Sequence, residues 1–197
     1  MTRGQPRLVR ALRTAQGECV TLQPIGPCDA GALQAYVRGL SPESRYNRFF
    51  GAMSELPPTE LDRVIHFDRR CELALLAKTR VDGKRVVIAE ARYVLAPGRL
   101  ESEFALSVAD DWRGRGLGTL LIIDIECRAR RDGVHRLCGD VLRSNGPMKA
   151  LARKTGFAMA DVPREVRLIR VVKDLAHSRA PRPCQALTTS TDLATAA

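Results

Sequence analysis

A glycine-rich turn between an apolar strand and an amphipathic helix constrains this sequence more than any other feature. Residues 108–119 read VADDWRGRGLGT, with glycine at every second position from 114 to 118, and helical spacing of apolar residues follows at once over 117–131. Amides that start a helix lack intrahelical partners and carry the positive end of the helix dipole, and glycines let a ligand approach them. The turn therefore predicts a phosphate or pyrophosphate site, to which Arg113 and Arg115 add positive charge.

Two better-known phosphate-binding loops do not match this turn. The dinucleotide-binding pattern G-x-G-x-x-G fails because Thr119 stands where the third glycine belongs. The Walker pattern needs Gly-Lys followed by Ser or Thr, and Gly83-Lys84 is followed by Arg85. A glycine-bearing turn that merely starts a helix is the alternative interpretation.

The order of strand and helix signals predicts an α+β fold with one strand–helix–strand crossover in its second half. Asp82-Gly83 predicts a hairpin turn, Ser41-Pro42 a helix N-terminus, and Gly156 a left-handed helix cap. Strands are expected over 19–24, 72–79, 85–94, 102–108, 135–141, 157–160 and 165–172, and helices over 30–40, 45–50, 57–67, 117–131 and 147–155.

The length and composition indicate a single soluble domain, since the 197 residues are 45% hydrophobic and 27% charged. Charges interrupt every apolar run before the ~20 residues that a membrane helix needs, and the N-terminus lacks the apolar segment of a secretory signal. We therefore expect a cytoplasmic protein with no membrane association. Residues 1–17 and 175–197 lack apolar periodicity, and we expect a flexible basic arm and a flexible tail around one domain over 18–174.

The charge and the cysteines give weaker indications. A net charge of +10 suits a phosphate-bearing ligand, an anionic membrane or nucleic acid, but the RNA-binding, zinc-finger and basic heptad signatures are missing, so nucleic acid is an unfavoured partner. None of the six cysteines forms a C-x-x-C pair, so no metal site is expected. A cysteine nucleophile beside a histidine is poorly supported, because Cys138 and His135 would face opposite sides of a strand.

Three segments together resemble the GCN5-related N-acetyltransferase (GNAT) superfamily. Residues 113–118, RGRGLG, are similar to its Q/R-x-x-G-x-G/A segment and follow the fourth strand, as in that superfamily. Residues 145–157 are similar to its N-x(10)-G-F segment. Residues 41–50, SPESRYNRFF, resemble the acceptor-side helix of bacterial protein-lysine acetyltransferases. The resemblance covers residues 18–174.

The resemblance implies a mostly antiparallel twisted sheet of six to seven strands, flanked by helices and splayed between the fourth and fifth strands (102–108 and 135–141). It implies acetyl-CoA or another acyl-CoA as the cofactor, and no metal. Main-chain groups of the fourth strand would bind the pantetheine, and the turn amides the pyrophosphate. The residues expected to contact the cofactor are Leu106, Ser107, Val108, Arg113, Gly114, Arg115, Gly116, Leu117, Gly118, Thr119 and Asn145.

Glu103 is the expected general base, because a carboxylate on the groove-lining strand can take a proton from an amine, whose pKa is about 10.4 for a lysine. It resembles the fourth-strand glutamate of protein-lysine acetyltransferases, and Glu101 is the second choice. The resemblance implies that the amide near Val108 polarises the thioester carbonyl. Many members carry a tyrosine as general acid where this chain has Ala152, so Tyr46 or water is expected to take that role.

The sequence thus predicts an N-acetyltransferase that acetylates a protein lysine or another primary amine, with a homodimer as a compatible assembly. The alternatives are a small-molecule amine acetyltransferase and a non-catalytic acyl-CoA-binding regulatory module. Four further residues are interpreted as structural rather than as contacts to the cofactor or the acceptor. They are Trp112 as a hydrophobic plug, His66 as a hydrogen-bonded helix residue, and Arg45 and Arg48 as solvated helix charges.

Overall fold

One sheet of eight strands runs through the residues that the structure, a computed structural model, describes: 9–68, 72–95 and 100–178. The strand order is β1-β2-β3-β4-β5-β6-β8-β7, and each neighbouring pair is antiparallel except β5 with β6. The strands are β1 (Arg10–Arg13), β2 (Cys19–Pro24), β3 (Glu72–Val81), β4 (Lys84–Leu95), β5 (Glu101–Val108), β6 (Arg136–Leu142), β7 (Ala158–Asp161) and β8 (Leu168–Asp174).

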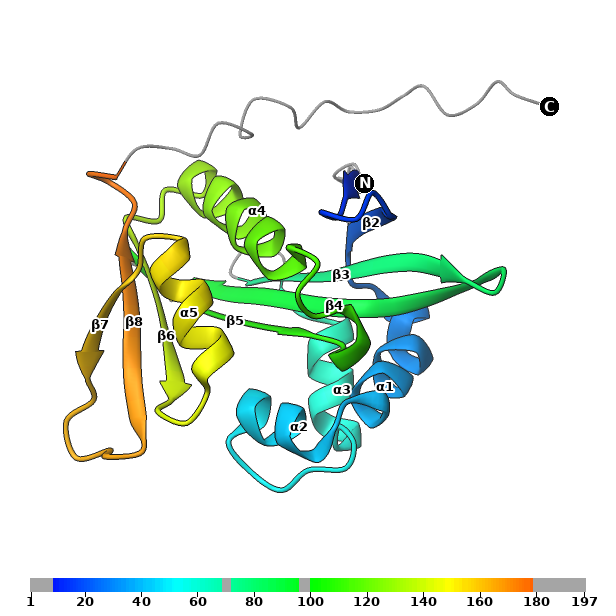
Figure 1. The fold of residues 1–197 in the computed structure, drawn as a ribbon, viewed down its shortest axis with the longest axis horizontal. Helices are drawn as coiled ribbons and strands as arrows, with labels where there is room; N and C mark the ends of the chain where they lie inside the picture. Colours follow the sequence, from blue (N-terminus) through cyan, green and yellow to red (C-terminus); the bar gives the residue numbers. More distant parts are fainter. Residues whose placement is uncertain (1–8, 69–71, 96–99, 179–197) are drawn as a thin grey trace.

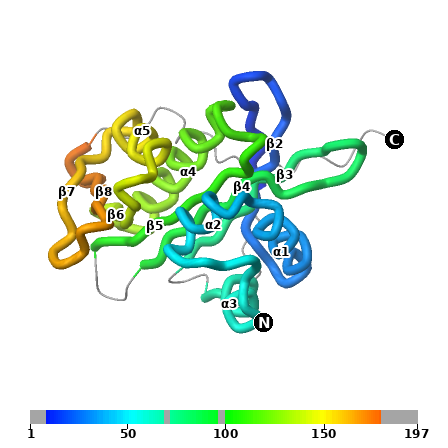
Figure 2. Tube along the Cα trace, turned by 60° about the horizontal axis from the view of Figure 1, so that its bottom comes forward, coloured from blue at the N-terminus to red at the C-terminus, as the bar shows by residue number. Residues whose placement is uncertain are grey.

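Helices cover both faces of this sheet. Figure 1 shows α4 and α5 on one side and α1, α2 and α3 on the other, and in Figure 2 these three helices lie in front of the sheet. The helices are α1 (Ala30–Gly39), α2 (Pro42–Phe49), α3 (Pro58–Ile65), α4 (Leu117–Arg131) and α5 (Gly146–Lys154). Among the described residues, no helix combines the length and the hydropathy needed to cross a bilayer.

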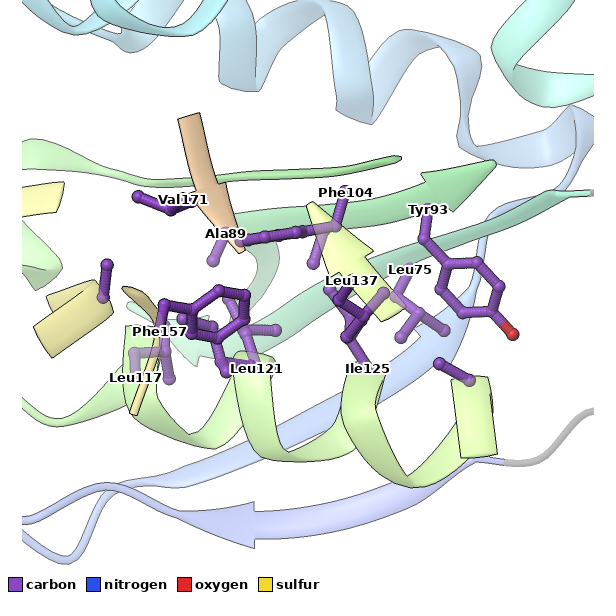
Figure 3. Packing of buried hydrophobic residues seen from close by; sticks show 14 of the residues in the cluster. Leu75, Ala89, Tyr93, Phe104, Leu117, Leu121, Ile125, Leu137, Phe157 and Val171 are labelled. Atoms are coloured by element: carbon purple, nitrogen blue, oxygen red, sulfur yellow. The ribbon is translucent and has the colours of Figure 1, made fainter. Parts of the chain in front are cut away.

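Because successive side chains of a strand point to opposite faces, the central strands contribute to two separate cores. In β3, Leu75 and Ala77 belong to the cluster under α4 and α5, whereas Ala74 and Leu76 belong to the cluster under α1 and α3. Figure 3 shows the first cluster, in which Leu121 and other side chains of α4 pack toward the sheet. This double coverage makes the central strands a rigid platform for whatever lies at their ends.

The turn and cap residues singled out in the sequence adopt the local structures predicted for them. Asp82 and Gly83 both adopt positive φ in the β3–β4 hairpin, with angles of 49° and 75°. Ser41 caps α2 by accepting a hydrogen bond from the amide of Ser44. Gly156 follows α5 with a φ of 82°. The mixed α+β architecture and the mostly antiparallel sheet are confirmed, with eight strands in place of six to seven.

Two parts of the predicted flexible ends, residues 10–13 and Leu175, belong to the folded sheet and core. Residues 10–13 form β1, the additional strand, which pairs antiparallel with β2. A single apolar side chain, Leu12, packs against the core from this strand, so its local pattern is too weak to predict it. Leu175 is 1% exposed, and its amide bonds the carbonyl of His135 at 2.7 Å. Residues 1–8 and 179–197 lie outside the described residues.

The sheet opens between β5 and β6, as expected. These two strands pair only through residues 101–103 with 136–138, whereas β5 stays paired with β4 as far as Val108 and β6 stays paired with β8 as far as Leu142. At the point of separation, a Cβ on Gly139 would lie 2.9 Å from the backbone oxygen of Phe104 and 3.2 Å from its ring. The two strands therefore touch at Gly139 and diverge beyond it.

Hydrogen-bond alternation decides which main-chain groups of β5 face this gap. In an antiparallel pair, alternate residues bond the neighbouring strand. The amide of Ala109 bonds the carbonyl of Ile88 at 2.9 Å, on the β4 side, so that Ser107 and Ala105 also face β4. The amides and carbonyls of Leu106 and Val108 consequently face the gap.

We predict that Gly139→Ala destabilises the protein by about 1–3 kcal/mol, because the new Cβ overlaps a backbone atom that cannot move aside like a flexible side chain. Gly31→Ala in α1 is the matched control, since nothing lies within 4 Å of its Cβ position, and it should raise stability by up to about 1 kcal/mol. Thermal unfolding of both variants measures the difference. Equal stability of Gly139→Ala and the parent protein would contradict the close contact of β5 with β6.

Candidate active site

A cavity of about 570 Å³ lies where β5 and β6 separate, within the size range of small-molecule sites. Its walls come from β5, β6, α2, α5 and the turn that precedes α4. Glu103 lines it, as do all but one of the residues predicted to contact a cofactor. These lining residues are Leu106, Ser107, Val108, Arg113, Gly114, Gly116, Leu117, Gly118, Thr119 and Asn145.

The glycines of the turn before α4 present backbone rather than side chains to this cavity. A 3₁₀ turn over Asp110–Trp112 leads into Gly114 and Gly116, whose φ angles of 73° and 80° lie in the left-handed region that favours glycine. Gly116 is the N-cap of α4 and supplies no side-chain cap. The first amides of α4 therefore lack a side-chain cap at the cavity wall, an arrangement that can accept an anion.

The two arginines of the turn point to different places, which spacing alone did not show. Arg113 lines the cavity, donates to Ser44 Oγ at 2.6 Å and pairs with Asp110 at 3.3 Å. Arg115 does not line the cavity, so its contact with a phosphate stays a prediction that this geometry does not favour. Its guanidinium pairs with Glu18 and stacks on the Trp112 ring at 4.5 Å.

Asp110 links the turn to the start of α2. Its carboxylate accepts hydrogen bonds from the Ser41 amide at 2.9 Å, from Ser41 Oγ at 3.1 Å and from Ser44 Oγ at 2.5 Å. Partial burial alone would raise the pKa of Asp110, but the hydrogen bonds from Ser44 and Ser41 bring it below its usual value. Since Arg113 also bonds Ser44, the arginine at the cavity and the capping end of α2 share one polar network.

The two candidate bases on β5 differ in their surroundings. Glu103 is exposed and lines the cavity. Glu101 lies outside the cavity lining, where it accepts from the Cys138 thiol at 3.3 Å and pairs with Arg136 at 3.5 Å. Only Glu103 of this pair lies where it can meet a ligand in the cavity.

A buried polar cluster forms the wall of the cavity below α2, and the sequence analysis missed it. Arg48 Nε donates to Glu90 Oε1 at 2.5 Å, Ser107 Oγ lies 3.4 Å from the same oxygen, and the Tyr36 hydroxyl lies 2.9 Å from Ser107 Oγ. Burial alone would raise the pKa of Glu90, but Arg48 and Arg92 bring it below its usual value, so the carboxyl is ionised. The available signal was a lone acid inside the apolar run VVIAEARYV.

Arg48 is therefore not a solvated helix charge, because its side chain is only 8% exposed. The other structural interpretations agree with the geometry: Trp112 packs against the core as well as lining the cavity, and His66 pairs with Asp62 at 2.9 Å outside the lining. Arg45 is half-buried rather than solvated, since it donates to the carbonyls of Arg38 and Leu40 at the end of α1.

The expected proton donor from the acceptor side is not at the cavity. Tyr46 is 40% exposed and does not line it, and Ala152 is fully buried in α5. Asn145 does line the cavity, and it also caps α5 by accepting from the amide of Met148 at 3.0 Å. The asparagine therefore holds the start of α5 against the gap.

The described residues support neither a cysteine nucleophile at Cys138 nor a metal site. Burial and the neighbouring Glu101 raise the pKa of the Cys138 thiol to about 12, so that it stays protonated at neutral pH. No group of three or more His, Cys, Asp or Glu in the described part of the chain is arranged to hold a metal ion.

Comparisons with known proteins agree with this geometry. A model described as the acetyltransferase (GNAT) family matches residues 42–157. An acetyltransferase of Pseudomonas aeruginosa is 28% identical over 141 residues, which cover 72% of this chain and 76% of the relative. The crystal structure of the GNAT domain of S. lividans PAT superposes with a TM-score of 0.77 at 26% identity, covering 85% of this chain and 97% of that domain.

A cAMP-binding acyltransferase from Mycobacterium smegmatis shares the fold, with a TM-score of 0.59 at 24% identity. The match covers 94% of this chain but only 51% of the mycobacterial protein. This chain therefore spans about half the length of that acyltransferase.

Proposed function

The chain belongs to the acetyltransferase (GNAT) family, and from this membership we propose that it transfers an acetyl group from acetyl-CoA to the side-chain amine of a protein lysine. Acyl transfer to amines is the general activity that the family and the curated relative support. The donor, the acceptor and the roles of single residues are argued from the cavity.

The observation that carries this proposal is the gap between β5 and β6. The main-chain groups of Leu106 and Val108 face the gap, where β6 has already moved away. An extended ligand with its own amide groups can bind such an edge in place of the missing strand. The pantetheine arm of coenzyme A has this chemistry, so the residues present fit the group.

The turn before α4 fits the pyrophosphate of coenzyme A. The uncapped amides at the start of α4 suit a pyrophosphate, and Arg113 adds a positive charge on the cavity side. Gly118 keeps α4 close to α5, since a Cβ there would lie 2.9 Å from Leu151 Cδ2. When bound, acetyl-CoA supplies an activated acetyl thioester.

We expect Arg113→Gln to weaken coenzyme A binding roughly three- to tenfold, because a half-exposed arginine contributes a modest charge-assisted interaction. Arg115→Gln makes the same charge change on the turn but faces Glu18 and Trp112, so binding should stay within about twofold. Calorimetric titration with coenzyme A separates the two variants. An equal loss in both, or a larger loss in Arg115→Gln, would show that Arg113 has no special position.

Glu103 is the proposed general base. An amine acceptor must lose a proton to attack an acyl group, and a carboxylate on the cavity wall can accept it directly or through one water. The exposure of Glu103 suits this role, since its side chain remains accessible to an incoming amine. Glu90 is unsuitable, because it is buried and already bonded to Arg48.

The distances along β5 favour the amide of Leu106 over that of Val108 as the group that polarises the thioester carbonyl. Glu103 and Val108 are five residues apart on an extended strand, about 16 Å, so one reacting carbon cannot lie beside both. The amide of Leu106 also faces the gap and is about 10 Å from Glu103 along the strand, within reach of a side chain and a bridging water. We therefore assign the carbonyl contact to Leu106 and the pantetheine contact to Val108.

The departing thiol needs no dedicated acid in this account. Ala152 cannot donate a proton, and Tyr46 lies outside the cavity lining. An aliphatic thiol has a pKa of about 8.5, so its anion is a stable leaving group near neutral pH and water can protonate it.

A protein lysine is favoured as acceptor by the resemblance of residues 41–50 to the acceptor-side helix of protein-lysine acetyltransferases. Tyr46 and Phe50 expose 40% and 43% of their surface on this segment, which suits contact with a protein acceptor beside the cavity. A small-molecule amine is the alternative. A cytoplasmic location and a homodimer stay predictions.

Glu103→Gln should lower kcat with a lysine peptide by about 10²–10⁴ while coenzyme A affinity stays unchanged, because the amide keeps the shape but cannot accept the proton. Glu101→Gln is the matched control, two residues away on the same strand and outside the cavity, and should keep its rate within about twofold. Thiol release with acetyl-CoA and a panel of peptides and small amines measures both variants.

The same assay separates the alternatives. Release with small amines alone would replace the lysine by a small acceptor. Tight coenzyme A binding without release for any amine would favour a non-catalytic acyl-CoA-binding module. Equal activity of Glu103→Gln and the parent protein would remove Glu103 from the mechanism.

A further inference from the structure

Arg48, near the end of α2, is a residue of the cavity lining and carries a buried nitrogen that has no partner among the described residues. Its side chain is only 8% exposed, and its Nε is bonded to Glu90 Oε1. Its Nη2 is buried and makes no hydrogen bond within the described chain. Because buried polar groups in native structures are almost always bonded, this nitrogen marks a place for an oxygen atom that a ligand supplies.

The residues around Arg48 hold its guanidinium group, and therefore Nη2, in one orientation. Glu90 is 3% exposed and holds Nε from β4, and the guanidinium also lies 5.1 Å from the centre of the Phe49 ring. Ser107 and Tyr36 add hydrogen bonds behind Glu90, from β5 and α1. A guanidinium held in this way loses little conformational entropy when it binds a further partner.

The charges around Arg48 distinguish an anionic partner from a neutral one. Two guanidinium groups, those of Arg48 and Arg92, interact with the single carboxylate of Glu90, so positive groups outnumber the acid that they share. Glu60 and Arg63 also interact with Arg92, and they pair with each other at 3.1 Å. A carbonyl would satisfy the N–H groups only, whereas a carboxylate satisfies them and balances the charge.

The acids of the cavity lining are Glu43, Glu103 and Asp140, and each is either distant along its element or already paired. Asp140 on β6 accepts hydrogen bonds from Arg170 Nε at 2.7 Å and Arg170 Nη2 at 2.8 Å. Glu103 is four residues from Ser107 on β5, about 13 Å. Glu43 is exposed in the first turn of α2, five residues before Arg48, which is a rise of about 7.5 Å.

We propose that Arg48 is a specificity-determining residue that binds a carboxylate of the amine acceptor, so that acceptors with an acidic group near the reacting amine are preferred. This inference rests on the proposed function and names the substrate class for the same cavity. The carboxylate comes either from an aspartate beside the lysine in a peptide or from the α-carboxylate of a small amino acid.

The test compares each acid with its uncharged amide. The first pair is a blocked Gly-Asp-Lys-Gly peptide and its Gly-Asn-Lys-Gly counterpart, and the second is free lysine and lysinamide. The parent protein should favour the acidic member of one pair by about tenfold or more in kcat/KM, the range of a charge-assisted hydrogen bond. Preference in the first pair identifies a peptide acceptor, and preference in the second a small one. Equal rates within both pairs would overturn the proposal while leaving acetyl transfer intact.

Three variants separate Arg48 from general charge and from folding. The double variant Arg48→Gln with Glu90→Gln replaces the buried ion pair by two amides and so avoids an unpaired buried charge. It should lower the acid-to-amide ratio to about one. Arg48→Lys keeps the charge and the Glu90 contact but loses the second nitrogen, and it should reduce the ratio severalfold. Arg38→Gln removes one positive charge from an exposed pair outside the cavity and should keep the parent ratio.

A binding readout keeps this inference distinct from the proposed activity. Calorimetric titration of the coenzyme A-loaded protein with the same compounds should show the same preference for the acid. If no amine accepts an acetyl group but the acidic compounds still bind tighter through Arg48, the proposed function fails and the recognition site stands. An unchanged acid-to-amide ratio in both a folded double variant and Arg48→Lys would remove Arg48 from acceptor recognition.

Discussion

The separation of β5 from β6 is the constraint on which the rest of the structure depends. The two strands meet at Gly139, where any side chain would collide with the backbone of Phe104, and beyond this contact each keeps only its outer partner. Unpaired main-chain groups normally cost stability, so a sheet that leaves them exposed at its centre needs support on both sides. The clusters under α4 and α5 and under α1 and α3 supply that support, and a cavity lies in the opening between the strands.

Helix α2 connects the two ends of this cavity. Its capping residues Ser41 and Ser44 bond Asp110, at the turn proposed to hold phosphates, while Arg48 near its other end is fixed against Glu90 in the sheet. Arg113 bonds Ser44 as well. A ligand that draws Arg113 toward a phosphate therefore changes a hydrogen bond at the start of the helix that presents Arg48. The proposed donor and acceptor sites thus contact opposite ends of one short helix.

Features fixed by neighbours in the sequence could be predicted, and features fixed by distant contacts could not. The glycines at 114 and 116, the Asp82-Gly83 turn and the Ser41 cap depend on local backbone conformation, so their residue types were sufficient. Strand β1 has little apolar pattern and exists because β2 pairs with it. The direction of Arg115 depends on Glu18, 97 positions away, and the buried position of Arg48 depends on Glu90 in another layer. Such contacts leave only faint signals, such as an isolated acid in an apolar strand.

Amide hydrogen exchange of individual β5 residues, measured by NMR with and without coenzyme A, tests the central claim most directly. In the free protein, the amides of Leu106 and Val108 should exchange fast, while those of Ala105 and Ser107, which face β4, should be protected. Saturating coenzyme A should slow the exchange of Leu106 and Val108 by at least about tenfold. Protection of these two amides in the free protein would mean that the strands are closed. Unchanged fast exchange in the saturated complex would mean that the ligand binds elsewhere.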